Sequence, residues 1–387
     1  MFNKILIKSG SNVAERYLSI ADVVDMMFYF NEVHVVISQF ELKQLLAVFG
    51  EDIFYELITS KRLIAHLCNQ HIGASKYGEL DSVGLFHHNF RSFDELLFNF
   101  HKETTNDFKE NKRFADRFSK VLLEYRYPKE INDSLYKDVE NEDLLSKVTQ
   151  VFIKQYYPNY RNVEDIHIKA DPSVSSFMTF YKIGGNLRIN ELNEMHHQNG
   201  YTGEFGYSTI LLALGETHMD CYLASELQAE MMVNQRWNEV YKLRINECIK
   251  CVDNTLGDIE HFHEMTAYDY LSPGQSFVDG LISPKELVNS MNCEDSIKFR
   301  EWLSKIPQGQ PISGELYKAI QNQNSNKLWV KGIRTFAQVV MGSIPIVGPF
   351  VGGALTLLDG FAGDKIINGW QPSMFVNKVL TKEQFKK

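Results

Sequence analysis

The segment NEVHVVISQFELKQLLAVFGEDIFYELITSKRLIAHLC, residues 31–68, decides the fold of the N-terminal part of the chain. It contains an apolar run, two helical stretches split at Gly50 and a second apolar run: Val33–Ser38, Phe40–Phe49, Asp52–Thr59 and Leu63–Cys68. Short apolar runs indicate strands, and a helical stretch between two strands indicates a crossover connection. Because such crossovers are right-handed and join parallel strands, the segment predicts a βαβ unit in a small, mostly parallel sheet.

A further strand and helix precede this segment. Lys4–Lys8 reads as a short strand. Ser19 and Asp22 have the spacing of a capping box and open a helix whose apolar residues recur at helical spacing: Ile20, Val23, Val24, Met27 and Phe30. We therefore expect residues 1–90 to form an α/β domain.

The middle of the chain is mainly helical in pattern. We expect a helical region over residues 91–160, with these helices: Phe93–His101, Phe108–Tyr125 and Asn141–Tyr157. A mixed, mainly helical domain follows over residues 161–306. It begins with short extended pieces at 166–168 and 177–183 and a hairpin-like turn at Gly184–Asn186, which leads into a further extended piece. The fold class that we predict is α+β.

The longest helical pattern of the chain starts near Tyr207 and runs to Val252, with a break near Asn234. One stripe of its second half is apolar: Trp237, Val240, Tyr241, Ile245, Cys248 and Val252. A last helix of this domain is expected at Glu294–Ser304. Residues 307–326 are rich in Gln, Asn, Ser, Gly and Pro and are typical of a linker.

Composition limits the function classes. The 387 residues include 40 Lys and Arg against 49 Asp and Glu, a formal charge of −9. This balance argues against binding to phosphate backbones, so no nucleic-acid partner is expected. Five cysteines are an odd number scattered through a long chain, which favours a reducing compartment. With no signal-peptide core at the start, we expect a cytoplasmic protein, with attachment to the periphery of the inner membrane as the alternative.

Common catalytic motifs are missing from the sequence. It contains no phosphate loop, no Gly-x-Gly-x-x-Gly, no nucleophile elbow and no His-Glu-x-x-His. Backbone N–H groups of Ser9–Ser11, directly after the first strand, suit an anion, but an ordinary turn is the simpler interpretation. The sequence therefore predicts no catalytic residue.

Two sets of residues have metal-ligand chemistry. Cys248, Cys251, His261 and His263 supply the number and type of ligands for a zinc site, although the cysteines also fit a buried helical stripe.

The second set consists of two Glu-x-x-His pairs and two carboxylates one helical turn apart: Glu194 with His197, Glu260 with His263, and Glu216 with Asp220. Such pairs hold iron in ferritin-like bundles, but a solvated surface explains Glu194 equally well. A metal-dependent enzyme that contains zinc or iron is the alternative function on these grounds.

The C-terminal segment, residues 327–387, is the most unusual part of the sequence. Between Arg334 and Asp359 no charged residue occurs for 24 positions. Pro345 and Pro349 interrupt any single helix, so the pattern predicts a hydrophobic hairpin of two helices, at about 328–342 and 350–368. The residues that we expect to mediate membrane association or assembly are Ile344, Ile346, Val347, Phe350, Val351, Leu355 and Leu358.

Three environments suit this predicted hairpin: the core of a soluble domain, a membrane, and an interface between protein chains. The sequence alone leaves these alternatives open.

The end of the chain carries Gly369-Trp370-Gln371-Pro372-Ser373-Met374-Phe375. With the hydrophobic stretch before it, this motif resembles a group of uncharacterised bacterial proteins with a C-terminal Gly-Trp-x-Pro-x-x-Phe, and the likeness extends to 186–193 and 298–303. The resemblance implies a shared fold and supplies no activity.

We therefore predict a bacterial intracellular effector or interaction protein, of the kind found in defence or stress responses. Its hairpin would mediate membrane association or assembly, and its partner would be another protein or a second copy. A soluble regulatory scaffold is the other alternative.

Overall fold

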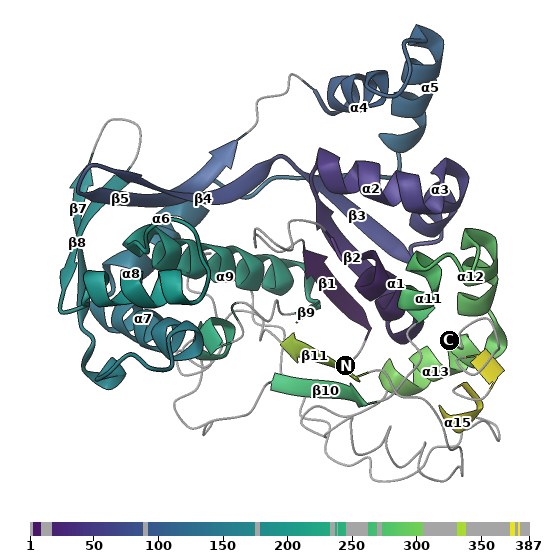
Figure 1. The fold of residues 1–387 in the computed structure, drawn as a ribbon. Coiled ribbons are helices and arrows are strands. Elements are labelled where there is room, and N and C mark those ends of the chain that lie inside the picture. Colours follow the sequence, from purple (N-terminus) through teal and green to yellow (C-terminus); the bar gives the residue numbers. More distant parts are fainter. Residues whose placement is uncertain are drawn as a thin grey trace, which may run out of the picture.

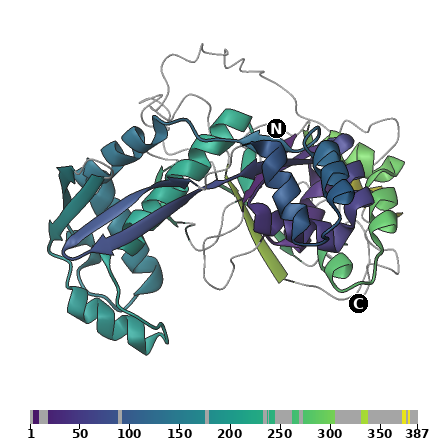
Figure 2. The same cartoon turned by 90° about the horizontal axis from the view of Figure 1, so that it is seen from above.

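A computed structural model describes most of the first 304 residues and three short later segments (Figure 1). The described residues are 3–8, 18–87, 92–174, 179–232, 237, 239–244, 262–268, 273–304, 331–337, 372–375 and 378–379. They form two lobes that are joined by long elements, and each lobe is built around its own sheet (Figures 1 and 2).

The larger lobe contains a seven-stranded sheet of order β10-β11-β9-β1-β2-β3-β6. Its strands in that order are Phe262–Tyr268, Lys331–Ala337, Glu230–Met232, Lys4–Lys8, Glu32–Ile37, Leu63–Cys68 and Leu123–Tyr125. The five strands from β9 to β6 are parallel, whereas β11 and β10 are antiparallel additions. The predicted parallel sheet with its βαβ unit is confirmed.

Helices share one apolar core with one face of the parallel strands. They are α1 (Ile20–Tyr29), α2 (Gln39–Phe49), α3 (Glu51–Thr59), α4 (Phe93–Lys102), α5 (Phe108–Phe118), α11 (Pro273–Val278), α12 (Pro284–Met291) and α13 (Glu294–Ser304). Ser19 caps α1 by accepting a hydrogen bond from the Asp22 N–H, as its spacing predicts. Phe375 of α15 (Pro372–Phe375) stacks on Phe299 with ring centroids 4.0 Å apart.

The smaller lobe contains a four-stranded antiparallel sheet of order β4-β5-β8-β7. Its strands are Gln70–Tyr77, Leu80–His87, Thr179–Gly185 and Ile168–Val174, and its helices are α6 (Ile131–Glu140), α7 (Glu142–Tyr156), α8 (Ile189–Gln198) and α9 (Tyr207–Leu227), with a 3-10 turn η1 (Val163–Asp165). The hairpin of β4 and β5 reaches from the larger lobe into the smaller one (Figure 1). The C-terminal half of α9 returns to the parallel sheet, where its Asp220 contacts Lys8 of β1.

Four predicted elements differ from the structure. The helix expected over Phe108–Tyr125 ends at Phe118, because the last three residues pair with β3 as β6. The turn at Gly184–Asn186 leads into α8 and not into a strand.

The long helical pattern from Tyr207 stops at Leu227, where Gln228 adopts a left-handed conformation (φ 53°), and the chain then forms β9. Residues 331–337 form β11, so the predicted helix 328–342 is wrong over these seven residues. For β6, β9 and β11, pairing with a distant strand overrides the local pattern. The rest of the predicted hairpin, residues 344–358 included, lies outside the described residues.

Candidate functional site

The candidate site lies at the carboxyl end of β1. In open parallel sheets, ligands bind beyond the carboxyl ends of the strands, at the point where the strand order reverses. Here β2 and β3 follow β1 on one side, whereas β9 pairs with β1 on the other side after a long excursion through the smaller lobe. Lys8, the last residue of β1, therefore stands at the reversal point of the sheet.

An ion pair links Lys8 to helix α9. Lys8 Nζ donates to Asp220 Oδ1 at 2.6 Å, and the Tyr241 hydroxyl donates to Asp220 Oδ2 at 2.5 Å. The side chains of Lys8 and Asp220 are 27% and 13% exposed. Burial acts to lower the pKa of Lys8, but Asp220 and the neighbouring acidic groups outweigh it and hold that pKa above its usual range. Lys8 is therefore a charged ammonium at neutral pH.

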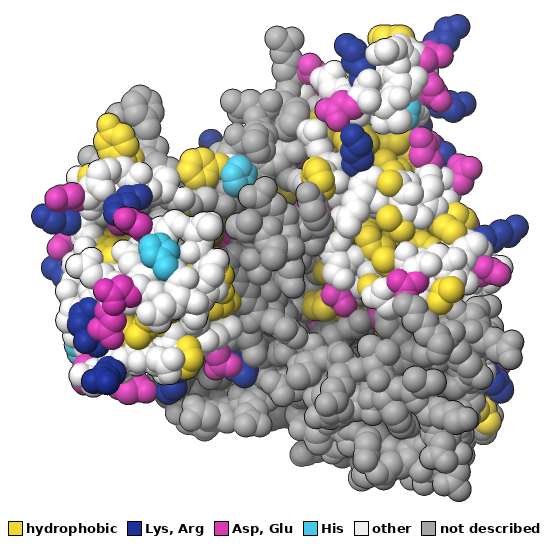
Figure 3. Space-filling view, viewed as in Figure 1, with side chains coloured by type: hydrophobic (Ala, Val, Ile, Leu, Met, Phe, Trp, Pro, Cys, Tyr) yellow, Lys and Arg dark blue, Asp and Glu magenta, His cyan; other side chains and the backbone are white. Residues whose placement is uncertain are grey.

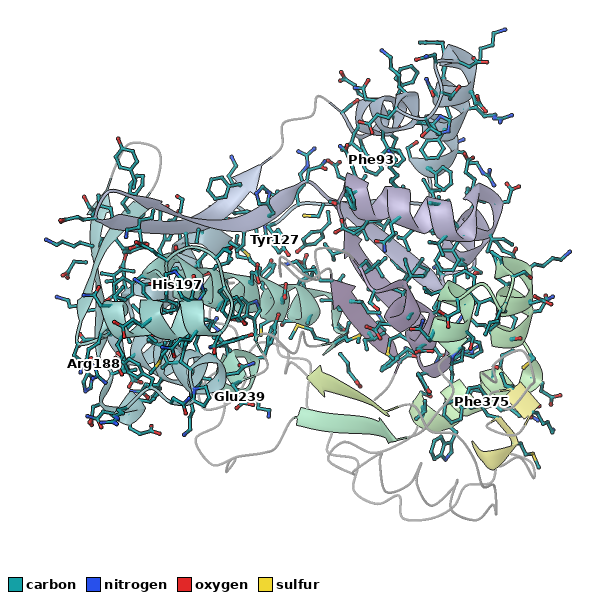
Figure 4. All side chains as sticks on the ribbon, in the orientation of Figure 1. Phe93, Tyr127, Arg188, His197, Glu239 and Phe375 are labelled. Atoms are coloured by element: carbon teal, nitrogen blue, oxygen red, sulfur yellow. The ribbon has the colours of Figure 1, made fainter. Side chains whose placement is uncertain are left out.

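Three further side chains surround this ion pair. Tyr127, labelled in Figure 4 between the two lobes, is 5% exposed, and its hydroxyl makes no hydrogen bond with any described residue. The ring of Tyr125 meets that of Tyr127 edge to face with centroids 5.0 Å apart, and its hydroxyl donates to Glu226 at 2.5 Å. Burial raises the pKa of both phenols and of the Cys68 thiol. The site thus contains buried neutral donors beside one ammonium group.

The sheet face below this cluster carries polar side chains among apolar ones. In the sheet register Val36 lies opposite both Lys8 and His66, so these side chains share a face. His66 Nε2 lies 2.9 Å from His34 Nδ1, and both residues are buried. Burial and the neighbouring His34 lower the pKa of His66 to about 4, so this ring is neutral at pH 7. Parallel strands that are covered on both faces normally carry apolar side chains on both, so this composition is unusual.

A second polar cluster joins helices α6 and α9 in the smaller lobe. Ser134 Oγ lies 2.9 Å from His218 Nε2, and His218 Nδ1 lies 2.5 Å from Asp138 Oδ2. These distances match those of a Ser-His-Asp triad. Arg244 joins them, with Nη1 2.6 Å from Asp138 Oδ2 and Nη2 2.8 Å from His218 Nδ1.

Hydrogen-bond roles argue against a triad in this cluster. The Ser134 hydroxyl has one proton, and it donates that proton to the Ile131 carbonyl at 2.9 Å in its own helix. The carboxylate of Asp138 only accepts, so its 2.5 Å contact places the imidazole proton on His218 Nδ1 and leaves Nε2 facing Ser134 as an acceptor. Burial and the adjacent guanidinium of Arg244 lower the pKa of His218, which opposes the imidazolium that a triad must form when its histidine takes the serine proton. The cluster is therefore best described as a buried ionic clamp.

The structure describes some of the metal ligands that the sequence suggests, and these have other partners. Glu216 is buried and accepts from Trp237 Nε1 at 2.5 Å, while Asp220 binds Lys8 and Tyr241. Glu194 is exposed on α8, as a solvated surface requires, and the ring of His197 lies 2.8 Å from the Gly203 carbonyl.

His263 lies in β10 opposite Phe336 in the strand register, whereas Cys248, Cys251, Glu260 and His261 lie outside the described residues. No group of three or more His, Cys, Asp or Glu in the described part of the chain is arranged to hold a metal ion.

Of the residues in the two clusters, sequence reasoning proposed only Asp220 as a functional group, and it placed Tyr241 on an apolar stripe. One local signal was present: a lysine closes the short strand Lys4–Lys8 immediately before Ser9–Ser11, which lie outside the described residues. The side chains around the ion pair of Lys8 and Asp220 include those of residues 127 and 241, and no spacing in the sequence connects them.

Charge and hydropathy agree with a mixed surface. On the face shown in Figure 3, acidic and basic side chains alternate over the described parts of both lobes. Among the residues that the structure describes, no helix has the length and apolar character to cross a membrane.

No family model, curated protein or solved structure significantly matches this chain.

Proposed function

We propose that the chain is a ligand-binding interaction protein, which takes a small anionic molecule at the carboxyl edge of its parallel sheet. The observation that carries this proposal is the position of Lys8, a charged ammonium at the reversal point between β1 and β9. The buried hydroxyl of Tyr127 supports it, because this group has no hydrogen-bond partner in the described part of the chain and can donate to a ligand at low cost in rearrangement.

Binding explains this site better than covalent chemistry does. A nucleophilic lysine needs a lowered pKa, and Asp220 raises that of Lys8 instead. Asp220 also accepts from Tyr241, so it holds the ammonium group in one place. A fixed cation beside neutral donors suits the recognition of a carboxylate or phosphate group.

Replacing Lys8 by glutamine is expected to weaken the binding of such an anion by roughly tenfold or more. The probes are ATP, NAD⁺ and inorganic phosphate, each added at millimolar concentration, and the readout is the shift in melting temperature of the full chain. Lys4→Gln, at the amino end of the same strand, is the matched control and should bind like the wild type.

Lys8→Arg keeps the positive charge and should retain part of the binding. If none of the three probes stabilises the wild type, or if Lys8→Gln and Lys4→Gln respond equally, the proposed ligand site is wrong.

A second function, membrane association or self-assembly through residues 335–358, rests on the 24 uncharged positions of that segment. We expect the full chain to cosediment with vesicles that contain anionic phospholipid, or to form oligomers in their absence. Val347→Asp should abolish either behaviour, because a charge in an apolar contact is costly. A wild-type chain that stays monomeric and ignores the vesicles would rule this function out.

A further inference from the structure

Two arginine side chains are buried close together where α1, α12 and α13 pack. Arg62, which directly precedes β3, is 8% exposed, and Arg300 of α13 is 3% exposed. The ring of Phe299, next to Arg300, lies 5.9 Å from that of Tyr29, the last residue of α1. Because Arg62 precedes a parallel strand, this pair lies at the amino edge of the sheet, opposite the edge that carries Lys8.

Each arginine donates to the end of a helix. Arg62 Nη1 donates to the Asn31 carbonyl at 2.7 Å, and Nη2 donates to the Met27 carbonyl in the last turn of α1. Arg300 Nη1 donates to the carbonyl of Met291, the last residue of α12, at 2.9 Å. Among the described residues, neither arginine forms an ion pair with a carboxylate. The Nε atoms of both are buried and have no hydrogen-bond partner there.

The charges at this place do not balance. A helix C-terminus contributes about half a negative charge, so two of them offset about one of the two positive charges. Burial, with the nearby charge of Arg300, lowers the pKa of Arg62 to about 9. Burial lowers the pKa of Arg300 to about 10, although Cys293 and the exposed carboxylate of Glu301 act to raise it. Both guanidinium groups still carry their charge at pH 7. About one positive charge therefore remains buried, which is costly unless an anion meets it.

We propose that Arg62 and Arg300 together bind a free tetrahedral oxyanion, phosphate or sulfate. The planar guanidinium fork matches two oxygens of such an ion, and two forks give the tight binding that a single lysine does not. An ion with one or two negative charges also offsets the remaining positive charge. This inference is independent of the Lys8 site, which lies at the other edge of the sheet.

Isothermal titration of the full chain with inorganic phosphate, in a chloride buffer of constant ionic strength, tests the proposal. The arginine pair should bind one phosphate per chain, counted separately from any phosphate that the Lys8 site takes. Arg62→Lys and Arg300→Lys keep the charge but lose the fork, and each should weaken binding by roughly tenfold. Arg113→Lys, at an exposed position of α5, should bind phosphate like the wild type.

Hydrogen exchange on the wild type gives a readout that does not depend on variants. Phosphate should slow amide exchange at residues 27–31 and 288–300, which surround the two arginines. Absence of binding by the wild type, equal weakening in Arg113→Lys, or protection confined to other residues would each overturn the proposal. Loss of all binding in Lys8→Gln would assign the phosphate to the other edge of the sheet and overturn it as well.

Discussion

Replacing Asp138 by alanine is expected to lower the free energy of unfolding by about 3 kcal/mol. Asp138 is the carboxylate that both Arg244 and His218 contact, and Arg244 and His218 are themselves buried. Burial alone would raise the pKa of Asp138, but Arg244 and His218 lower it below its usual value, which shows how strongly they hold the carboxylate. Breaking a buried ion pair usually costs more, and the 22% exposure of the Asp138 side chain reduces the expected effect.

Urea unfolding followed by far-UV circular dichroism measures this change. The control is Asp143→Ala, which removes an exposed ion pair with Lys147 one helical turn away and should cost about 0.5 kcal/mol. Equal losses in the two variants would show that the clamp of Asp138, His218 and Arg244 does not stabilise the smaller lobe. Retained stability with lost hydrolysis of an ester probe would instead support the triad that the hydrogen bonds argue against.

Replacing Glu230 by glutamine is expected to raise the free energy of unfolding, relative to that of the wild type, by about 4 kcal/mol as the pH increases from 4 to 8. Glu230 begins β9, is buried, and its Oε1 has no hydrogen-bond partner among the described residues. Burial raises the pKa of this carboxyl from 4.5 to about 8. Between these two values the unfolded chain releases the proton and the folded chain keeps it, so the wild type loses stability as the pH rises through this window.

Glutamine carries no titrating proton, so the stability of the variant relative to the wild type should rise steadily from pH 4 to pH 8. Melting temperatures across this range measure the gain, and Glu239→Gln, at an exposed position, provides the baseline. A difference between Glu230→Gln and the wild type that stays constant with pH would contradict the prediction, whatever its sign.

The sequence is informative where the structure is local. The parallel strands β1 to β3 and their crossover helices follow from apolar runs and helical spacing within the first 68 residues. The strands β6 and β9 have only three residues each. Such short segments adopt the strand conformation only because they pair with a neighbouring strand of the sheet. Local pattern assigned both to helices for this reason.

The same distinction applies to the candidate site. Lys8 and Asp220 are 212 positions apart, and Ser134 and His218 are 84 apart. Side chains meet across such separations only through the tertiary fold, so no motif in the sequence announces them. The carboxylates Glu216 and Asp220 were noticed because they share a helix, but their partners Trp237 and Lys8 decide what they do.

The position of β9 has a consequence for how the chain is made. β1 is synthesised before the other strands of its sheet. One of its two neighbours is β9, whose residues 230 and 231 pair with residues 5 and 6 of β1. At about 5 to 20 residues per second, synthesis takes roughly 10 to 45 s to reach β9. During that time the nascent chain carries a bare apolar strand edge, so a chaperone that shields such edges would raise the yield of folded protein.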